Sequence, residues 1–144
     1  MNNLPNCLYL HPTHRAEMEA DVSAKAPEEA CGILAGKGNL SHLVIPVTNM
    51  LHSEFRFRMD PKEELRAFLL VEDNGLEILA IYHSHPQGIN KPSITDLDEV
   101  TFLGIIYLIW YMQDDKWECR GYLMKSQIEY DEVPVIITEV SNES

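Results

Sequence analysis

The chain has 144 residues, of which 45% are hydrophobic, and its 23 acidic residues outnumber its 11 basic residues to give a formal net charge of −12. This length and composition predict one domain, residues 1–144, with its own hydrophobic core. The negative charge argues against nucleic acid as a partner, because binding to a phosphate backbone depends on basic residues that release counterions.

The first 60 residues carry one helical pattern followed by strand patterns. A short apolar run, residues 7–10, comes before a helix that Pro12 can begin and Pro27 ends. The apolar side chains at helical spacing within it are Ala16, Met18, Ala20, Val22 and Ala24. Residues 30–35 and 42–47 are predicted strands of a hairpin that turns at residues 36–39. Residues 54–59, EFRFRM, alternate polar and apolar side chains, which predicts a strand with one solvent-facing side.

The rest of the chain begins with the strongest helical pattern, PKEELRAFLLVEDNG, which Gly75 ends. The side chains predicted to share its apolar face are Leu65, Phe68, Leu69 and Val71. A short helix is expected at residues 93–103, and strands are expected at residues 76–83, 105–112, 117–124 and 133–138. The order of elements predicts an α/β fold of the α+β-like kind, with one mixed sheet of about six to eight strands.

Neither a membrane span nor an oxidised cysteine framework is expected. The longest unbroken apolar stretch, residues 105–112, is much shorter than the roughly 18 residues of a membrane-spanning helix. The N-terminus lacks a basic region ahead of an apolar core. Three cysteines without zinc-finger spacing indicate neither disulfides nor a thiolate zinc site. We therefore expect a cytoplasmic protein that does not bind membranes.

Chemistry concentrates in residues 82–96, YHSHPQGINKPSITD. Side chains alternate faces along a strand, so His83 and His85 project to the same side at its end. A loop with two prolines can bring Asp96 back to them, and two histidines with one carboxylate leave a tetrahedral ion one open position, as in catalytic zinc sites. The residues also have simpler explanations. Ser93 and Asp96 suit the start of a helix, and Asp98 and Glu99 are rival ligands or ordinary first-turn acids.

The stretch resembles the signature of the JAMM metalloproteases, the MPN+ branch of the Mov34/MPN domain, whose pattern is H-S/T-H-P-x6-S-x-x-D. The family also carries a glutamate two residues before a Cys-Gly that opens a strand, and Glu29 in PEEACGIL matches it. The resemblance covers nearly the whole chain and is similar to the short prokaryotic members. It implies a curved mixed sheet flanked by two or three helices, with the layering of cytidine deaminases.

The resemblance also implies roles for individual residues. His83, His85 and Asp96 would hold one Zn²⁺ per chain, and Glu29 would act as general base and then general acid. Ser93 would donate its hydroxyl hydrogen to the oxyanion. Without the resemblance, Glu29 would be an ordinary exposed acid, with its neighbour Glu28 as a rival.

The implied reaction is hydrolysis of a peptide or isopeptide bond after the C-terminal glycine of a ubiquitin-like or sulfur-carrier protein. A Gly-Gly tail suits a narrow groove because it has no side chains and can pair as an added strand. The chain lacks length for the insertions that hold ubiquitin in eukaryotic deubiquitinases, so a dedicated ubiquitin-binding surface is not expected.

Two other functions remain open. The chain could be a non-catalytic MPN scaffold, which bound zinc and loss of cleavage in Glu29→Gln would exclude. It could also be a non-haem iron enzyme, since two histidines and a carboxylate form that triad as well. Activity of iron-free protein with zinc alone would exclude iron. The sequence leaves the oligomeric state open, with a homodimer as one outcome.

Overall fold

The computed structural model describes residues 6–93, 104–126 and 129–139. Among these residues the chain forms two helices and eight strands. They follow one another as β1 (Leu8–Leu10), α1 (Pro12–Lys25), β2 (Cys31–Lys37), β3 (Leu40–Val47), α2 (Pro61–Asp73), β4 (Glu77–His85), β5 (Ile106–Gln113), β6 (Lys116–Met124), β7 (Tyr130–Val133) and β8 (Val135–Ile137). The predicted α/β class and the number of strands are confirmed. Most of the helix predicted at residues 93–103 lies outside the described residues.

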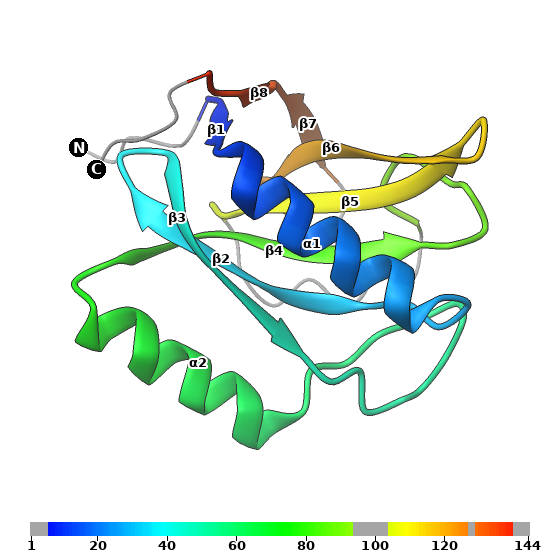
Figure 1. Ribbon diagram of the computed structural model, residues 1–144, viewed down its shortest axis with the longest axis horizontal. Helices are drawn as coiled ribbons and strands as arrows, with labels where there is room; N and C mark the ends of the chain where they lie inside the picture. Colours follow the sequence, from blue (N-terminus) through cyan, green and yellow to red (C-terminus); the bar gives the residue numbers. More distant parts are fainter. Residues whose placement is uncertain (1–5, 94–103, 127–128, 140–144) are drawn as a thin grey trace.

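All eight strands belong to one mixed sheet in the order β7-β6-β5-β4-β2-β3-β1-β8. Strand β4 runs parallel to β5 and antiparallel to β2, so it lies inside the sheet with neighbours on both sides. Strands β7 and β8 stand at opposite ends of the order although only Pro134 separates them in the chain. The sheet must therefore curl until its two ends meet, and Figure 1 shows β1, β7 and β8 close together.

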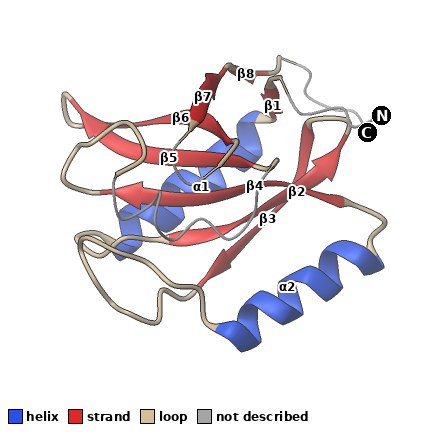
Figure 2. Cartoon of the chain, turned by 180° about the vertical axis from the view of Figure 1, so that it is seen from behind, coloured by secondary structure: helices blue, strands red, loops and turns tan. Residues whose placement is uncertain are grey.

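Alternation of side chains along the inner strands gives the sheet a core on each face. On one face, Met18 and Val22 of α1 pack in a cluster with Leu34 of β2. On the other face, Ala67 and Val71 of α2 share a cluster with residues of β2, β4 and β5. The two helices accordingly lie on different sides of the sheet (Figures 1 and 2). Neither helix has the length and apolar character that crossing a membrane requires, as far as the described residues extend.

Both helices begin as their sequences predict. The ring nitrogen Nδ1 of His11 accepts a hydrogen bond from Thr13 N at 3.1 Å, and Pro12 occupies the first turn of α1. The Asp60 carboxylate caps α2 by accepting from Lys62 N and Glu63 N at 2.9 and 3.1 Å. These caps satisfy backbone N–H groups that have no partner inside the helix.

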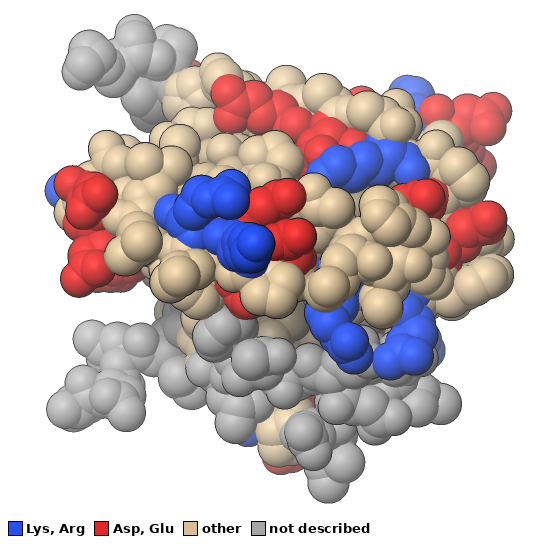
Figure 3. All heavy atoms as spheres, turned by 90° about the horizontal axis from the view of Figure 1, so that it is seen from below, with Lys and Arg blue, Asp and Glu red and all other residues tan. Residues whose placement is uncertain are grey.

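The predicted apolar faces of the helices are partly wrong. Helix α1 buries Met18 and Val22, whereas the three alanines of its predicted stripe face solvent. Helix α2 buries Ala67 and Val71, and the side chains of Leu65 and Leu69 are 59% and 50% exposed. Phe68 of α2 is partly buried against the same core cluster as Ala67 and Val71, so this part of the predicted face is confirmed. The face with α2 shows acidic and basic side chains interspersed, as on a solvent-facing surface (Figure 3).

Two strand predictions are also wrong. The strand predicted at residues 133–138 is divided at Pro134 into β7 and β8, which pair with different neighbours. Pro134 has no N–H to donate to a neighbouring strand, so the pairing with β6 ends there and the pairing with β1 begins after it. Residues 54–58 form no strand. Only Met59 makes an isolated bridge, to Asn49, and Phe55 is 66% exposed. This segment instead closes a loop, residues 49–59, between β3 and α2.

Candidate metal centre

The two histidines meet at the end of β4, as predicted from strand alternation. Their side chains are 0% and 4% exposed, and Nε2 of His83 lies 3.1 Å from Nε2 of His85. His83 is flanked in the sheet by Cys31 of β2 and Ile109 of β5, so its position is fixed from both sides. The imidazoles stand edge to face, with centroids 4.8 Å apart.

Ser84, between the histidines, points to the opposite face and organises the start of β2. Its hydroxyl accepts a hydrogen bond from Ala30 N at 2.8 Å, and Ser84 N donates to Ala30 O at 3.1 Å. These two hydrogen bonds join Ala30, which follows Glu29, to Ser84, which lies between the histidines. The segment before β2 is thereby held against the end of β4.

This arrangement places the acidic side chain of Glu29 beside the two histidines. Its side chain is buried, 3% exposed, and one carboxylate oxygen joins a ring nitrogen from each histidine in a group whose ligand atoms all lie within 4.8 Å of one another. The side chain of Glu28 is 41% exposed and its carboxylate lies 3.3 Å from Nδ1 of His52 on the surface. The structure thus favours Glu29 over its neighbour as the acid of the site.

The surroundings of the rings favour metal binding. The His85 Nδ1–H donates to Ile89 O at 2.8 Å, because a carbonyl can only accept. This bond leaves the lone pair of the neutral ring on Nε2, facing His83, as in histidines that ligate metals. Phe57 stacks on the His83 ring, with centroids 4.6 Å apart and planes inclined by 24°, and so limits its rotation.

The donor set fits a small divalent cation. Two nitrogens that bind Zn²⁺ at 2.0–2.1 Å in a tetrahedron lie about 3.3 Å apart, close to the separation of the two Nε2 atoms. Cys31 shares this face of the sheet, but its thiol donates to Val47 O at 3.4 Å. Burial raises the pKa of Cys31 to about 12, because it disfavours the charged thiolate.

The remaining predicted site residues lie at or beyond the limit of the described chain. Ser93 is half-buried and is the last described residue before the gap, while Asp96 and its rivals Asp98 and Glu99 fall outside the described residues. The loop that leads to them is anchored, since the Tyr122 hydroxyl donates to Asn90 O at 2.6 Å. Glu29, His83 and His85 are therefore brought together, and the third predicted ligand is not described.

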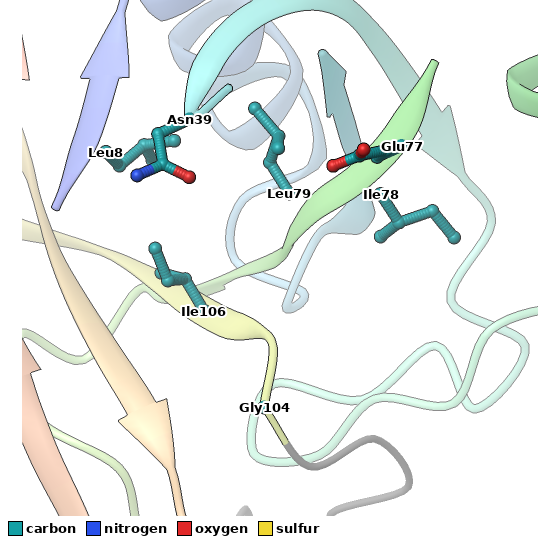
Figure 4. Close-up of a pocket in the computed structure, with 7 residues that line it drawn as sticks. All are labelled: Leu8, Asn39, Glu77, Ile78, Leu79, Gly104 and Ile106. Atoms are coloured by element: carbon teal, nitrogen blue, oxygen red, sulfur yellow. The ribbon is translucent and has the colours of Figure 1, made fainter. Parts of the chain in front are cut away.

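A separate cavity lies at the other end of β4. Its lining includes Leu8, Asn39, Leu79 and Ile106 (Figure 4). It begins at Glu77, six residues before His83, which corresponds to about 20 Å along an extended strand. This distance separates the cavity from the histidines, so it takes no part in the site.

Comparison with known proteins assigns the family. The profile of Prok-JAB, the prokaryotic homologs of the JAB domain, matches residues 11–127. The chain belongs to this family. The resemblance to JAMM proteins noted from the sequence is confirmed, and so is the prediction of an enzyme, because the named relatives of this family member are JAMM-type peptidases and desampylases.

Three curated relatives illustrate the relationship. A desampylase of Pyrococcus furiosus is 30% identical over 126 residues, which cover 88% of each chain. A CysO-cysteine peptidase of Mycobacterium tuberculosis is 33% identical over 73% of this chain and 74% of the relative. A probable TtuB-protein conjugate cleaving protease of Thermus thermophilus is 39% identical over 58% of this chain and 56% of the relative.

Solved structures share the fold. A protein from Desulfitobacterium hafniense, solved in solution, superimposes with a TM-score of 0.83 at 32% identity and covers 92% of this chain and 94% of that one. A JAB1/MPN domain protein of Archaeoglobus fulgidus gives a TM-score of 0.59 at 19% identity, with 92% and 97% of the two chains covered. The predicted JAMM fold class is confirmed by these neighbours.

Sequence reasoning missed two residues around the site, Phe57 and Asn49. The alternation of Phe57 with charged residues predicts a strand, and nothing in that pattern points to His83. Asn49 is 4% exposed, and the sequence carries no signal that points to a role for it at the site. Both act through the 49–59 loop, whose shape depends on contacts distant in the sequence.

Proposed function

We propose that this chain is a zinc-dependent hydrolase that cleaves a peptide or isopeptide bond after the C-terminal glycine of a ubiquitin-like or sulfur-carrier protein. The observation that carries the proposal is the meeting of Glu29, His83 and His85 in a buried group at the end of β4. Burying a carboxylate beside two imidazoles costs free energy unless the carboxylate compensates a positive charge or takes part in proton transfer.

In this proposal His83 and His85 would hold the cation through Nε2, and Asp96 would complete the protein ligands. Zn²⁺ at such a site supplies Lewis acidity that activates water and polarises a carbonyl at neutral pH. The His85 bond to Ile89 O keeps the lone pair of that ring directed inward. Burial excludes bulk water from the histidine side of the site, which strengthens every electrostatic interaction there.

Glu29 is proposed as the proton carrier. Its carboxylate accepts a proton from the attacking water as the oxygen bonds to the carbonyl carbon. It then delivers this proton to the amine nitrogen as the carbon–nitrogen bond breaks, leaving on the glycine a carboxyl group that gives up its remaining proton to solvent. A group that serves as base and then acid must lie near both atoms, and a segment held by the Ser84 bonds keeps Glu29 in place.

Ser93 is proposed to stabilise the oxyanion. Its hydroxyl hydrogen would be donated to the carbonyl oxygen as negative charge develops there. The hydroxyl oxygen of Ser93 can at the same time accept a hydrogen bond from a helix N–H, because a hydroxyl donates one hydrogen and accepts at its lone pairs. Capping and catalysis are therefore compatible at this position.

The substrate class is proposed from chemistry and from the relatives. These relatives are named for cleaving sampylated, TtuB-linked or CysO-linked partners. A tail ending in Gly-Gly can pair with a strand edge and reach a site set at the end of β4.

The proposal is tested by incubating the protein with sulfur carriers extended beyond their Gly-Gly ends, with and without a chelator, and measuring intact mass. Loss of the residues beyond the glycine, absent with chelator and restored by zinc alone, is the expected result. Cleavage that persists in chelator, or no cleavage of any carrier by zinc-loaded protein, would contradict it.

A further inference from the structure

The side chain of Asn49 connects three parts of the chain around the candidate metal centre. It is buried just beyond β3, where Met50 N donates to Arg58 O at 2.9 Å and Asp60 N donates to Thr48 O at 3.0 Å. These backbone bonds close the neck of the 49–59 loop. The amide of Asn49 points into the loop from this neck.

Four hydrogen bonds use the full capacity of this amide. Its Nδ2 group donates to Glu29 O at 2.9 Å and to Arg56 O at 3.0 Å. Its Oδ1 atom accepts from Leu51 N and from Arg58 N, both at 3.1 Å. An amide has two donor hydrogens and two acceptor positions, so the side chain is satisfied only in this loop conformation.

One end of this network holds the backbone of Glu29. The carbonyl of Glu29 accepts from Asn49, and its N–H donates to Ser53 O at 2.8 Å, so both groups bond to the loop. The other end holds Phe57, because its neighbours Arg56 and Arg58 are the residues that Asn49 binds. Phe57 in turn stacks on the imidazole of His83.

We propose that Asn49 is a positioning residue that sets the placement of Glu29 relative to His83. The inference rests on the proposed function, in which these two residues are the proton carrier and a metal ligand. Asn49 touches neither reacting group directly. It acts through the carbonyl of Glu29 and through the ring of Phe57, so loss of its amide would shift the acid and loosen the imidazole together.

Two substitutions separate this role from a general contribution to folding. Asn49→Asp has nearly the same size and keeps the acceptor for Leu51 N and Arg58 N, but it loses the donors to Glu29 O and Arg56 O. Asn74→Ala is the matched control, because Asn74 also donates an amide bond, to Leu70 O at 2.8 Å, at the exposed end of α2. Phe57→Leu removes the stacked ring without changing Asn49.

The measurements are zinc affinity by chelator competition, kcat and KM on an extended sulfur carrier, and the imidazole NMR signals of His83 in metal-free protein. Asn49→Asp and Phe57→Leu should each weaken zinc binding by about 10- to 100-fold and shift the His83 signals, as loss of a ligand's outer partners does. Asn49→Asp should also lower kcat by at least about tenfold with KM nearly unchanged. Asn74→Ala should change none of these quantities.

The inference would be overturned if folded Asn49→Asp kept its zinc affinity and kcat within twofold of wild type and left the His83 signals unshifted. An equal loss in Asn74→Ala would overturn it as well. If Asn49→Asp does not fold, Phe57→Leu with unchanged zinc affinity and His83 signals overturns it. The zinc and NMR measurements need no substrate. A wild-type protein that cleaves no carrier would contradict the proposed function and leave this inference standing on those two results.

Discussion

The ring of Tyr82 lies against the α-carbon of Gly32, its register partner across β2 and β4. A β-carbon at position 32 would collide with Cε2, Cζ and the hydroxyl oxygen of that ring. The ring cannot swing away freely, because its hydroxyl donates to Asp21 at 2.7 Å. Burial, with the Asp21 carboxylate nearby, raises the pKa of Tyr82 and keeps the hydroxyl a donor. The glycine of the Glu-x-Cys-Gly motif therefore accommodates a tyrosine next to His83.

We expect Gly32→Ala to lower the free energy of unfolding by about 1–3 kcal/mol, since overpacking a filled site forces neighbours out of place. Urea denaturation followed by circular dichroism measures the change. The same substitution in a Tyr82→Leu background should cost clearly less, because the colliding ring is gone. Equal costs in the two backgrounds would show that Tyr82 is not the obstacle.

Glu29→Gln should retain zinc and lose activity. The amide is nearly the same size as the carboxylate but cannot carry the proton, and a positioned general base contributes about 10²- to 10⁴-fold. Turnover of an extended sulfur carrier and zinc content by elemental analysis measure the two effects.

Glu28→Gln is the control for this prediction, because its carboxylate lies at the surface beside His52. It should keep turnover near the wild-type value. If Glu28→Gln is the inactive variant, or if Glu29→Gln loses zinc, the assigned acid or its role is wrong.

Tyr122→Phe should reduce kcat/KM severalfold while the fold stays intact. It removes one hydroxyl, the donor to Asn90 O, and so frees the loop that leads to Ser93. Losing one such bond costs about 0.5–1.5 kcal/mol in stability. Tyr130→Phe, a ring in contact with Tyr122 at 5.4 Å between centroids, is the control and should leave kcat/KM unchanged. Identical kinetics for the two variants would refute an anchoring role for the hydroxyl.

The cysteines should differ in reactivity. Burial raises the pKa of both Cys31 and Cys119 to about 12, because it disfavours the charged thiolate. At pH 8 only about 10⁻⁴ of such a thiol is ionised, and the thiolate is the reactive form. Iodoacetamide should therefore add to the native protein once, at Cys7, and spare Cys119, which is half-buried like Cys7. In urea it should add three times. Peptide mapping that finds native Cys31 or Cys119 alkylated at pH 8 would contradict this.

The sequence predicted most strands and both described helices because their signals are local. Proline and glycine mark the ends of α1 and α2, and apolar runs mark β4 and β5. Alternation along β4 also placed His83 and His85 on one side, since a strand fixes that relation whatever surrounds it. Glu29 was assigned only through the family resemblance, because its approach to the histidines depends on the pairing of β2 with β4 and on Ser84.

The failures occurred where distant contacts decide. Residues 54–59 alternate like a strand, but the backbone groups of this segment bond to Asn49 and its neighbours, which no periodicity reveals. The predicted stripe of α2 is right for Phe68 and Val71, which pack on the sheet, and wrong for Leu65 and Leu69, which face solvent while the smaller Ala67 is buried.

We propose that His83, His85 and Asp96 hold zinc while Glu29 lies beside it as the proton carrier. An anomalous difference map at the zinc edge, from crystals grown with zinc alone, tests it most directly. We expect one peak at about 2.0–2.1 Å from both Nε2 atoms and from an Asp96 oxygen, with the Glu29 carboxylate beyond bonding distance of the metal. A peak bonded to Glu29 in place of Asp96, or no peak between the two imidazoles, would contradict the account.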